Sequence, residues 1–263
     1  MKLHLPGKYF LAGLLLVATA AVLIMIALIT NRGDITSAAV VISGMICAVT
    51  GIFILTFSGG EPIDPWLVGI LPTQDLINVC RIASDLGITG NTYFLPHHVT
   101  GETRVMLFNP VSTYLGGRVQ SGDSFPLSGP KGLVTVPSCD PLIRDLQKRN
   151  TLPKTDNKDD VTRLLRETIS GIYEFAPDIS ASWQGNAVTV TFHGYRFIDG
   201  CQVIARESPR CCSMHPCVAC SLCGAMIAGC MDRVVSLDQC SSDVSSQNVT
   251  AVFSLLPVPD RHP

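Results

Sequence analysis

Two runs of sequence decide the architecture: YFLAGLLLVATAAVLIMIALIT at residues 9–30 and ITSAAVVISGMICAVTGIFILTF at residues 35–57. Neither run contains a charged residue. An α-helix rises about 1.5 Å per residue, so each run reaches roughly 33 Å, enough to cross a hydrocarbon core of about 30 Å. The sequence therefore predicts a protein of the cell membrane with two transmembrane helices.

The link between the runs is the polar tetrapeptide Asn-Arg-Gly-Asp at residues 31–34, which suits a tight turn. Two spans with so short a link predict an antiparallel transmembrane hairpin over residues 9–57. A signal peptide is the alternative for the first run, because Lys2 and Lys8 precede it. The apolar core of a signal peptide is about 7–15 residues and ends at small residues, whereas this run is longer and ends in Leu-Ile-Thr-Asn-Arg. An uncleaved span is favoured.

Lysine and arginine near the spans predict the orientation, because they concentrate on the cytoplasmic side. Residues 1–8 carry Lys2 and Lys8, the link carries Arg32, and the next basic residue after the second span is Arg81. We therefore expect both termini in the cytoplasm.

Small side chains form a stripe on the second span, at a spacing of four residues. They are Ala39, Ser43, Cys47 and Gly51. Such stripes let helix backbones approach closely in lipid. The stripe is interpreted as packing on the first helix of the same chain or, alternatively, as the seam of a homodimer within the lipid bilayer.

The rest of the chain predicts one tethered domain. Residues 58–65 (SGGEPIDP) form a Gly/Pro-rich linker, residues 66–256 the domain, and residues 257–263 a tail. About 200 residues are enough for a single core. From residue 64 onward 16 Lys and Arg stand against 19 Asp and Glu. No basic patch is evident, so nucleic acid is not an expected partner.

Hydrophobic periodicity predicts helices and strands in mixed order. The expected helices are residues 73–86, 140–149, 159–175 and 216–231, and the expected strands are residues 92–95, 103–108, 133–136, 179–183, 187–193, 234–237 and 249–255. Gln184-Gly185-Asn186 marks a hairpin between two of the strands. Antiparallel strands with packed helices place the domain in the α+β class.

Cysteine is abundant, with 11 residues, six of them between residues 211 and 230. Thiolates and imidazole suit zinc or an iron–sulfur cluster. The candidate ligands are Cys211, Cys212, His215, Cys217, Cys220 and Cys223. The ferredoxin spacing is not met, and a second Cys-x-x-Cys pair at zinc-finger spacing is missing.

Plain packing is the favoured interpretation of these cysteines. Residues 217–231 are apolar on every side, which is typical of a buried helix, and free cysteine behaves there as a small hydrophobic residue. At about 100° per residue, the side chains of Cys217, Cys220 and Cys223 drift around the helix instead of converging. No cofactor is then expected. A metal site and a redox role are the alternatives.

Catalytic signatures are weak. Cys201, His193 and Asp199 have the residue types of a nucleophile with its base, but no strand–turn–helix motif frames them. No glycine-rich loop has the spacing of a nucleotide-binding motif. We expect a non-enzymatic module for sensing or for interaction with an unknown protein partner. The alternatives are a metal-binding protein and an enzyme of unknown class.

Two resemblances add to these expectations. His215-Pro216, the apolar helix after it and Met231-Asp-Arg-Val-Val235 resemble the C-terminal end of an archaeal family of uncharacterised membrane proteins. The strands at residues 93–96 and 105–110 are similar too, and the family has two N-terminal transmembrane helices before one domain. The tail is also similar to four-vinyl-reductase-like sensor domains, which bind small ligands. It lacks their closing glycine–aspartate–cysteine arrangement, and Cys240 stands alone.

Overall fold

The computed structural model describes residues 8–30, 35–57, 64–88, 90–120, 122–126, 129–149 and 151–256. The chain divides into two compact units, residues 1–63 and 64–263. Four predicted segments lie outside the described residues, wholly or for the most part: the N-terminus at 1–8, the link at 31–34, the linker at 58–65, and the tail at 257–263.

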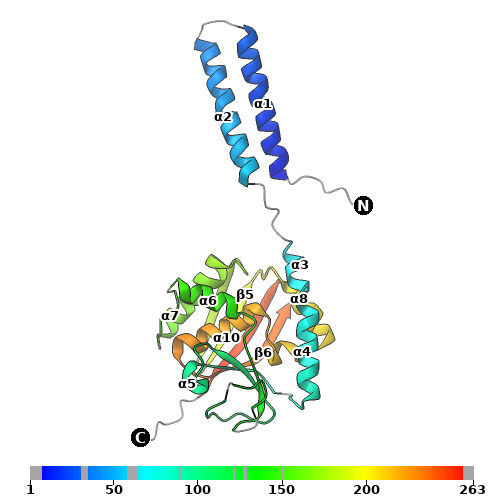
Figure 1. Ribbon diagram of the computed structural model, residues 1–263, viewed down its shortest axis with the longest axis vertical. Coiled ribbons are helices and arrows are strands. Elements are labelled where there is room, and N and C mark those ends of the chain that lie inside the picture. Colours follow the sequence, from blue (N-terminus) through cyan, green and yellow to red (C-terminus); the bar gives the residue numbers. More distant parts are fainter. Residues whose placement is uncertain are drawn as a thin grey trace. The chain divides into compact units, whose positions relative to one another are not determined.

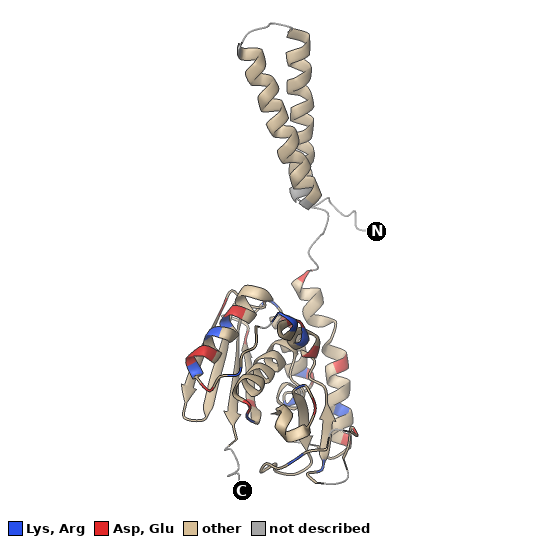
Figure 2. Cartoon of the chain, turned by 60° about the vertical axis from the view of Figure 1, so that its left-hand side comes forward, with Lys and Arg blue, Asp and Glu red and all other residues tan. Residues whose placement is uncertain are grey.

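The first unit consists of α1 (Lys8–Thr30) and α2 (Ile35–Phe57), so both predicted apolar helices are confirmed. Stretches within them, Leu11–Thr30 and Thr36–Thr56, are long and apolar enough to cross a membrane. Figure 2 shows charged residues spread over the second unit, in contrast to these helices. A third stretch, Cys211–Met231, also qualifies by length and composition, but 78% of its most apolar window is buried inside the second unit.

Small residues mediate the contact between α1 and α2, which lie side by side (Figure 1). A Cβ atom at Gly51 would lie 2.8 Å from Val17, and a Cβ at Gly13 would lie 2.9 Å from Leu55. Within the predicted stripe, Gly51 is buried whereas Ala39 and Ser43 are exposed. A spacing of four residues advances about 40° per step around a helix, so the stripe winds away from the contact.

The second unit is built on one antiparallel sheet of seven strands, in the order β3-β2-β1-β6-β7-β5-β4. The strands are β1 (Tyr93–Leu95), β2 (Met106–Pro110), β3 (Gly132–Thr135), β4 (Asp178–Gln184), β5 (Ala187–His193), β6 (Val235–Asp243) and β7 (Asn248–Leu255). The α+β class is confirmed. β6 extends well beyond the predicted strand at residues 234–237, because its outer half pairs with β7 across a bulge between Leu237 and Gln239.

The helices of this unit are α3 (Pro65–Ile70), α4 (Thr73–Asp85), α5 (His97–Thr100), α6 (Asp140–Lys148), α7 (Lys158–Arg166), α8 (Ile198–Glu207), α9 (Cys211–Met214) and α10 (Val218–Met231). The predicted helix at residues 159–175 instead divides into α7 and a π-helical turn, η1 (Glu167–Ile172). The hydrophobic pattern of the sequence did not predict α3, α5, α8 and α9. For α8 a signal existed, since buried Ile198, Cys201 and Ile204 recur every three residues.

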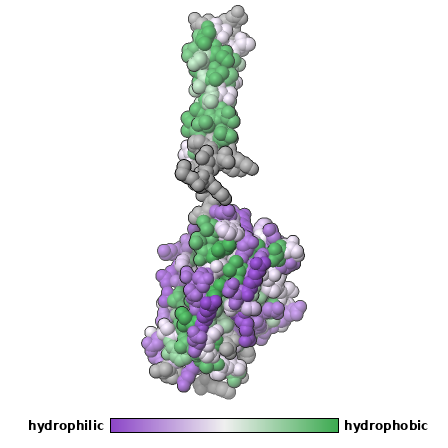
Figure 3. Space-filling model, turned by 90° about the vertical axis from the view of Figure 1, so that its right-hand side faces the viewer, coloured by the Kyte–Doolittle hydropathy of each residue, from purple (hydrophilic) through white to green (hydrophobic). Residues whose placement is uncertain are grey.

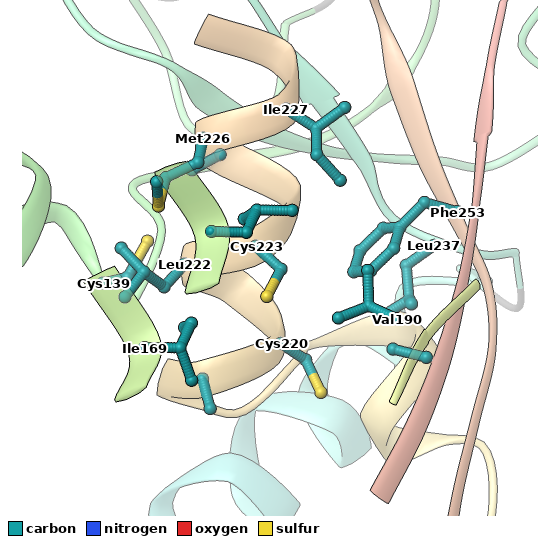
Figure 4. Packing of buried hydrophobic residues seen from close by; sticks show 14 of the residues in the cluster. Cys139, Ile169, Val190, Cys220, Leu222, Cys223, Met226, Ile227, Leu237 and Phe253 are labelled. Carbon is teal, nitrogen blue, oxygen red and sulfur yellow. The ribbon is translucent and has the colours of Figure 1, made fainter. Parts of the chain in front are cut away.

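Helix α10 forms the centre of the core, as the sequence predicts for a helix that is apolar all round. Figure 4 shows Cys223 directed toward Val190 and Phe253 of the sheet, while Leu222 and Met226 lie on the other side of the helix. A Cβ at Gly224 would overlap the ring of Phe94, so glycine lets α10 approach the sheet closely.

The surface of the second unit is mixed. Figure 3 shows apolar areas interrupted by hydrophilic side chains on the face that lies to the right in Figure 1, where α3, α4 and α8 are drawn. Short α3 buries none of its residues and exposes Trp66, Leu67 and Val68.

Candidate functional site

Five cysteine side chains from four consecutive elements, α8, α9, α10 and β6, meet beside the first turn of α10. They are Cys201 on α8, Cys212 on α9, Cys217 just before α10, Cys220 on α10, and Cys240 on β6. Cys217 is hydrogen-bonded to the thiols of Cys201 and Cys220, and Cys240 to those of Cys212 and Cys220. The Sγ atoms of Cys220 and Cys240 are 3.8 Å apart. We call these five residues the thiol cluster.

Helix α9 is held in place by two contacts from other parts of the chain. A disulfide joins Cys211 to Cys80 on α4, with 5.7 Å between the Cα atoms. The buried side chain of Asn109 donates from Nδ2 to the carbonyl oxygen of Met214 at 2.6 Å. These contacts fix the backbone on which Cys212 is carried.

Mutual hydrogen bonding divides the thiol cluster into acceptors and donors. Bonds from Cys201 and then Cys220 hold the pKa of Cys217 well below its usual range, against the opposing effect of burial. Bonds from Cys212 and Cys220 lower the pKa of Cys240 to about 5. The same bonds, together with burial, raise the pKa values of the three donor thiols. Cys217 and Cys240 are therefore the sulfurs that carry negative charge most readily.

The predicted ligand set is only partly brought together. Cys212, Cys217 and Cys220 belong to the thiol cluster, whereas Cys211 forms the disulfide with Cys80. Cys223 lies in the apolar core, where burial raises its pKa, and burial lowers the pKa of His215. Among the described residues, no group of three or more His, Cys, Asp or Glu side chains is arranged to hold a metal ion.

The predicted ligand set did not include Cys201 and Cys240, which also belong to the thiol cluster. Neither falls in the dense cysteine run, and only the tertiary fold brings α8 and β6 to α10. The predicted nucleophile and base, Cys201 and His193, have different partners in the structure. Cys201 is hydrogen-bonded to Cys217, and Nε2 of His193 instead pairs with the Ser180 hydroxyl at 3.0 Å.

An apolar pocket of about 170 Å³ opens beside the thiol cluster. Its lining comes from α3, α4, α8, the start of α10 and several loops: Val68, Gly69, Pro72, Leu76, Ser138, Phe175, Tyr195, Phe197, Gly200, Cys201, Ile204, Cys217, Val218 and Ala219. Cys201 and Cys217 belong to both the pocket and the thiol cluster. The two features therefore form one site, which we call the thiol pocket.

Aromatic rings form one wall of the thiol pocket. The ring centroids of Phe175 and Phe197 are 5.7 Å apart, and those of Tyr195 and Phe197 also 5.7 Å, both in edge-to-face geometry. Such pairs stabilise each other beyond their buried area, so the wall is preformed. Burial raises the pKa of Tyr195, which leaves a neutral hydroxyl 4.0 Å from Sγ of Cys217.

Two glycines let α3 and α8 approach each other at the pocket. A Cβ at Gly200 of α8 would overlap the backbone of Gly69 on α3, so the helices touch through bare backbone. The Ser138 hydroxyl donates to the carbonyl oxygen of Pro216 at 3.3 Å and ties down the turn that carries Cys217. Every wall of the thiol pocket thus belongs to the second unit.

Comparison with known proteins adds no relative: no family matches the chain, and neither a curated protein nor a solved structure matches it. The two resemblances in the sequence therefore stay predictions.

Proposed function

We propose that the chain is a membrane-anchored sensing module whose second unit binds a small apolar molecule in the thiol pocket. The observation that best supports this proposal is a preformed pocket with an aromatic wall and few polar groups. Ligand sites are concave and mostly apolar, with a few placed polar atoms. The resemblance to ligand-binding sensor domains agrees with this proposal.

The size of the pocket limits its ligand. A dry apolar cavity of about 150 Å³ in another protein binds benzene, and the thiol pocket has about 170 Å³. A molecule with one aromatic ring therefore fits. A hydroxyl group on it would find the Tyr195 hydroxyl and the Cys217 thiol as hydrogen-bond partners.

The anchor in this proposal is an antiparallel hairpin of α1 and α2 across the bilayer. Helix α3 is the first described element after α2, and its residues Val68 and Gly69 line the pocket. A bound ligand contacts α3 directly, so occupancy changes the packing of α3 on α8.

Filling the pocket should weaken ligand binding. In lipid nanodiscs, the full chain should bind p-cresol in isothermal titration calorimetry, beyond the partitioning measured with empty nanodiscs. Val68→Trp places a bulky ring at the pocket wall, and we expect at least a tenfold loss of affinity, a loss of about 1.4 kcal/mol.

Val244→Trp is the matched control, because Val244 is also an exposed valine, 54% accessible, and does not line the thiol pocket. This variant should bind like the unmodified chain. Absence of p-cresol binding beyond partitioning, across a panel that also includes toluene and indole, would overturn the proposed function.

The proposed orientation places both termini in the cytoplasm. The Lys and Arg distribution supports it, whereas the Cys80–Cys211 disulfide is a feature of oxidising compartments. Protease added to right-side-out membrane vesicles decides between them. We expect the second unit to resist digestion until the vesicles are lysed; digestion in intact vesicles would place it outside and leave the pocket proposal untouched.

Metal binding is the second candidate, favoured by the convergence of five thiols. Cys212, Cys217, Cys220 and Cys240 would supply the soft ligands that zinc or an iron–sulfur cluster prefers. Among the described residues, no three His, Cys, Asp or Glu side chains are arranged to hold a metal ion. Metal binding would therefore require these cysteine side chains to move. Stoichiometric metal in the purified full chain, lost in Cys217→Ser, would replace the first proposal for the thiol cluster.

A further inference from the structure

We propose that Cys201 and Cys217, at the wall of the thiol pocket, are an oxidation site at which an apolar organic hydroperoxide converts the two thiols into a disulfide. The inference rests on the proposed function, because it assigns a ligand class to the same pocket. It goes further in giving that ligand a chemical reaction.

Geometry is the first support. Both cysteines line the same pocket wall, Cys201 from α8 and Cys217 from the residue before α10. Cys217 is partly exposed, whereas Cys201 is only 5% accessible. An oxidant held in the pocket therefore meets Cys217 with a second thiol adjacent. A partly accessible thiol beside a resolving thiol is the usual arrangement of redox-sensing cysteines.

The position of Cys217 at the start of α10 is the second support. Its carbonyl oxygen accepts the backbone N–H of Ser221 at 2.8 Å, so Cys217 stands at the N-terminus of a 14-residue helix. The helix dipole stabilises negative charge there, and thiolates are favoured at such positions. The thiolate is the reactive form.

The chemistry of the pocket selects the oxidant. The lining is dominated by aliphatic and aromatic side chains, so an apolar hydroperoxide gains binding energy there that hydrogen peroxide does not. Other cysteines in the fold are unsuited to the reaction. Burial raises the pKa of Cys139 to about 12 and of Cys230 to about 11, and neither lines the pocket.

The reaction balances in two steps. The Cys217 thiolate attacks the outer oxygen of ROOH; the O–O bond breaks, and the products are Cys217 sulfenic acid and RO⁻, which takes a proton to become ROH. The Cys201 sulfur then attacks the sulfenic sulfur, the S–O bond breaks, and the hydroxyl leaves as water with the Cys201 proton. Two thiols and one hydroperoxide thus yield one disulfide, one alcohol and one water.

The test uses the full chain in nanodiscs, analysed for metal and treated with cumene hydroperoxide. Mass spectrometry of digested, alkylated protein locates the new bond. Cys201 is the sole cysteine between Arg196 and Arg206, whereas the tryptic peptide of residues 211–233 carries six cysteines. Fragment ions of the cross-linked pair therefore assign the partner of Cys201 within that peptide. We expect a Cys201–Cys217 disulfide, formed about tenfold faster than with hydrogen peroxide, a preference that needs about 1.4 kcal/mol of pocket binding.

Variants and one analogue separate the outcomes. Cys217→Ser should abolish the cross-link and Cys230→Ser should retain it. The double variant Cys201→Ala/Cys220→Ala removes both thiols beside Cys217. It should leave a Cys217 sulfenic acid that dimedone traps, which keeps the test valid if Cys217→Ser misfolds. Cumyl alcohol has the same skeleton without the O–O bond. Its binding in calorimetry, without any disulfide from the hydroperoxide, would overturn this inference and leave the proposed function standing. Stoichiometric bound metal, or a disulfide of Cys217 with Cys220 instead, would also overturn it.

Discussion

Replacing Phe253 with alanine is expected to lower the free energy of unfolding by about 3–5 kcal/mol, the usual cost of deleting a fully buried aromatic ring. Phe253 lies on central strand β7 with no accessible surface, and its ring packs edge-to-face on Phe94 at 6.4 Å between centroids. Phe94 is also the ring against which Gly224 brings α10 close. The cavity would therefore open between the sheet and the central helix.

Urea unfolding of the full chain in nanodiscs, followed by tryptophan fluorescence, measures this loss. Leu115→Ala is the control, since Leu115 is 90% exposed; a surface change of this kind stays within about 0.5 kcal/mol. A Phe253→Ala variant as stable as the control would contradict the packing of α10 on β7.

Loss of the Cys80–Cys211 disulfide is expected to have the second large effect, a destabilisation of about 2–5 kcal/mol. The bond joins residues 131 apart in the sequence, and constraining a long loop removes much entropy from the unfolded chain. The double variant Cys80→Ala/Cys211→Ala avoids leaving one thiol free beside Cys212. The same urea titration measures the loss, with Cys230→Ala as a control for replacing a buried cysteine that is not in a disulfide.

The disulfide should also matter for the thiol pocket. It ties α4, which contributes Leu76 to the lining, to α9, which carries Cys212 of the thiol cluster. Release of α9 from α4 loosens both features, so p-cresol affinity should fall together with stability in the double variant. Unchanged stability and affinity would show that the bond does not form in the protein as it exists in the membrane.

The sequence by itself determined the features that depend on local pattern. Two charge-free runs predicted α1 and α2, because length and hydropathy alone decide whether a helix can span lipid. The turn signal Gln184-Gly185-Asn186 predicted the β4–β5 hairpin, whose register pairs Ile179 with Phe192. The apolar run after Pro216 predicted a buried helix, since a helix without a polar face needs burial on every side.

Only the tertiary structure decided the site. Cys201, Cys217 and Cys240 lie on α8, just before α10 and on β6, and their meeting depends on the docking of α8 and on β6 extending past its bulge to pair with β7. The pocket wall likewise joins α3 to α8 through Gly69 and Gly200. Side-chain spacing along one helix fixes directions only around that helix. Packing between elements decides which cysteine sulfurs lie next to one another. Local sequence patterns do not encode that packing.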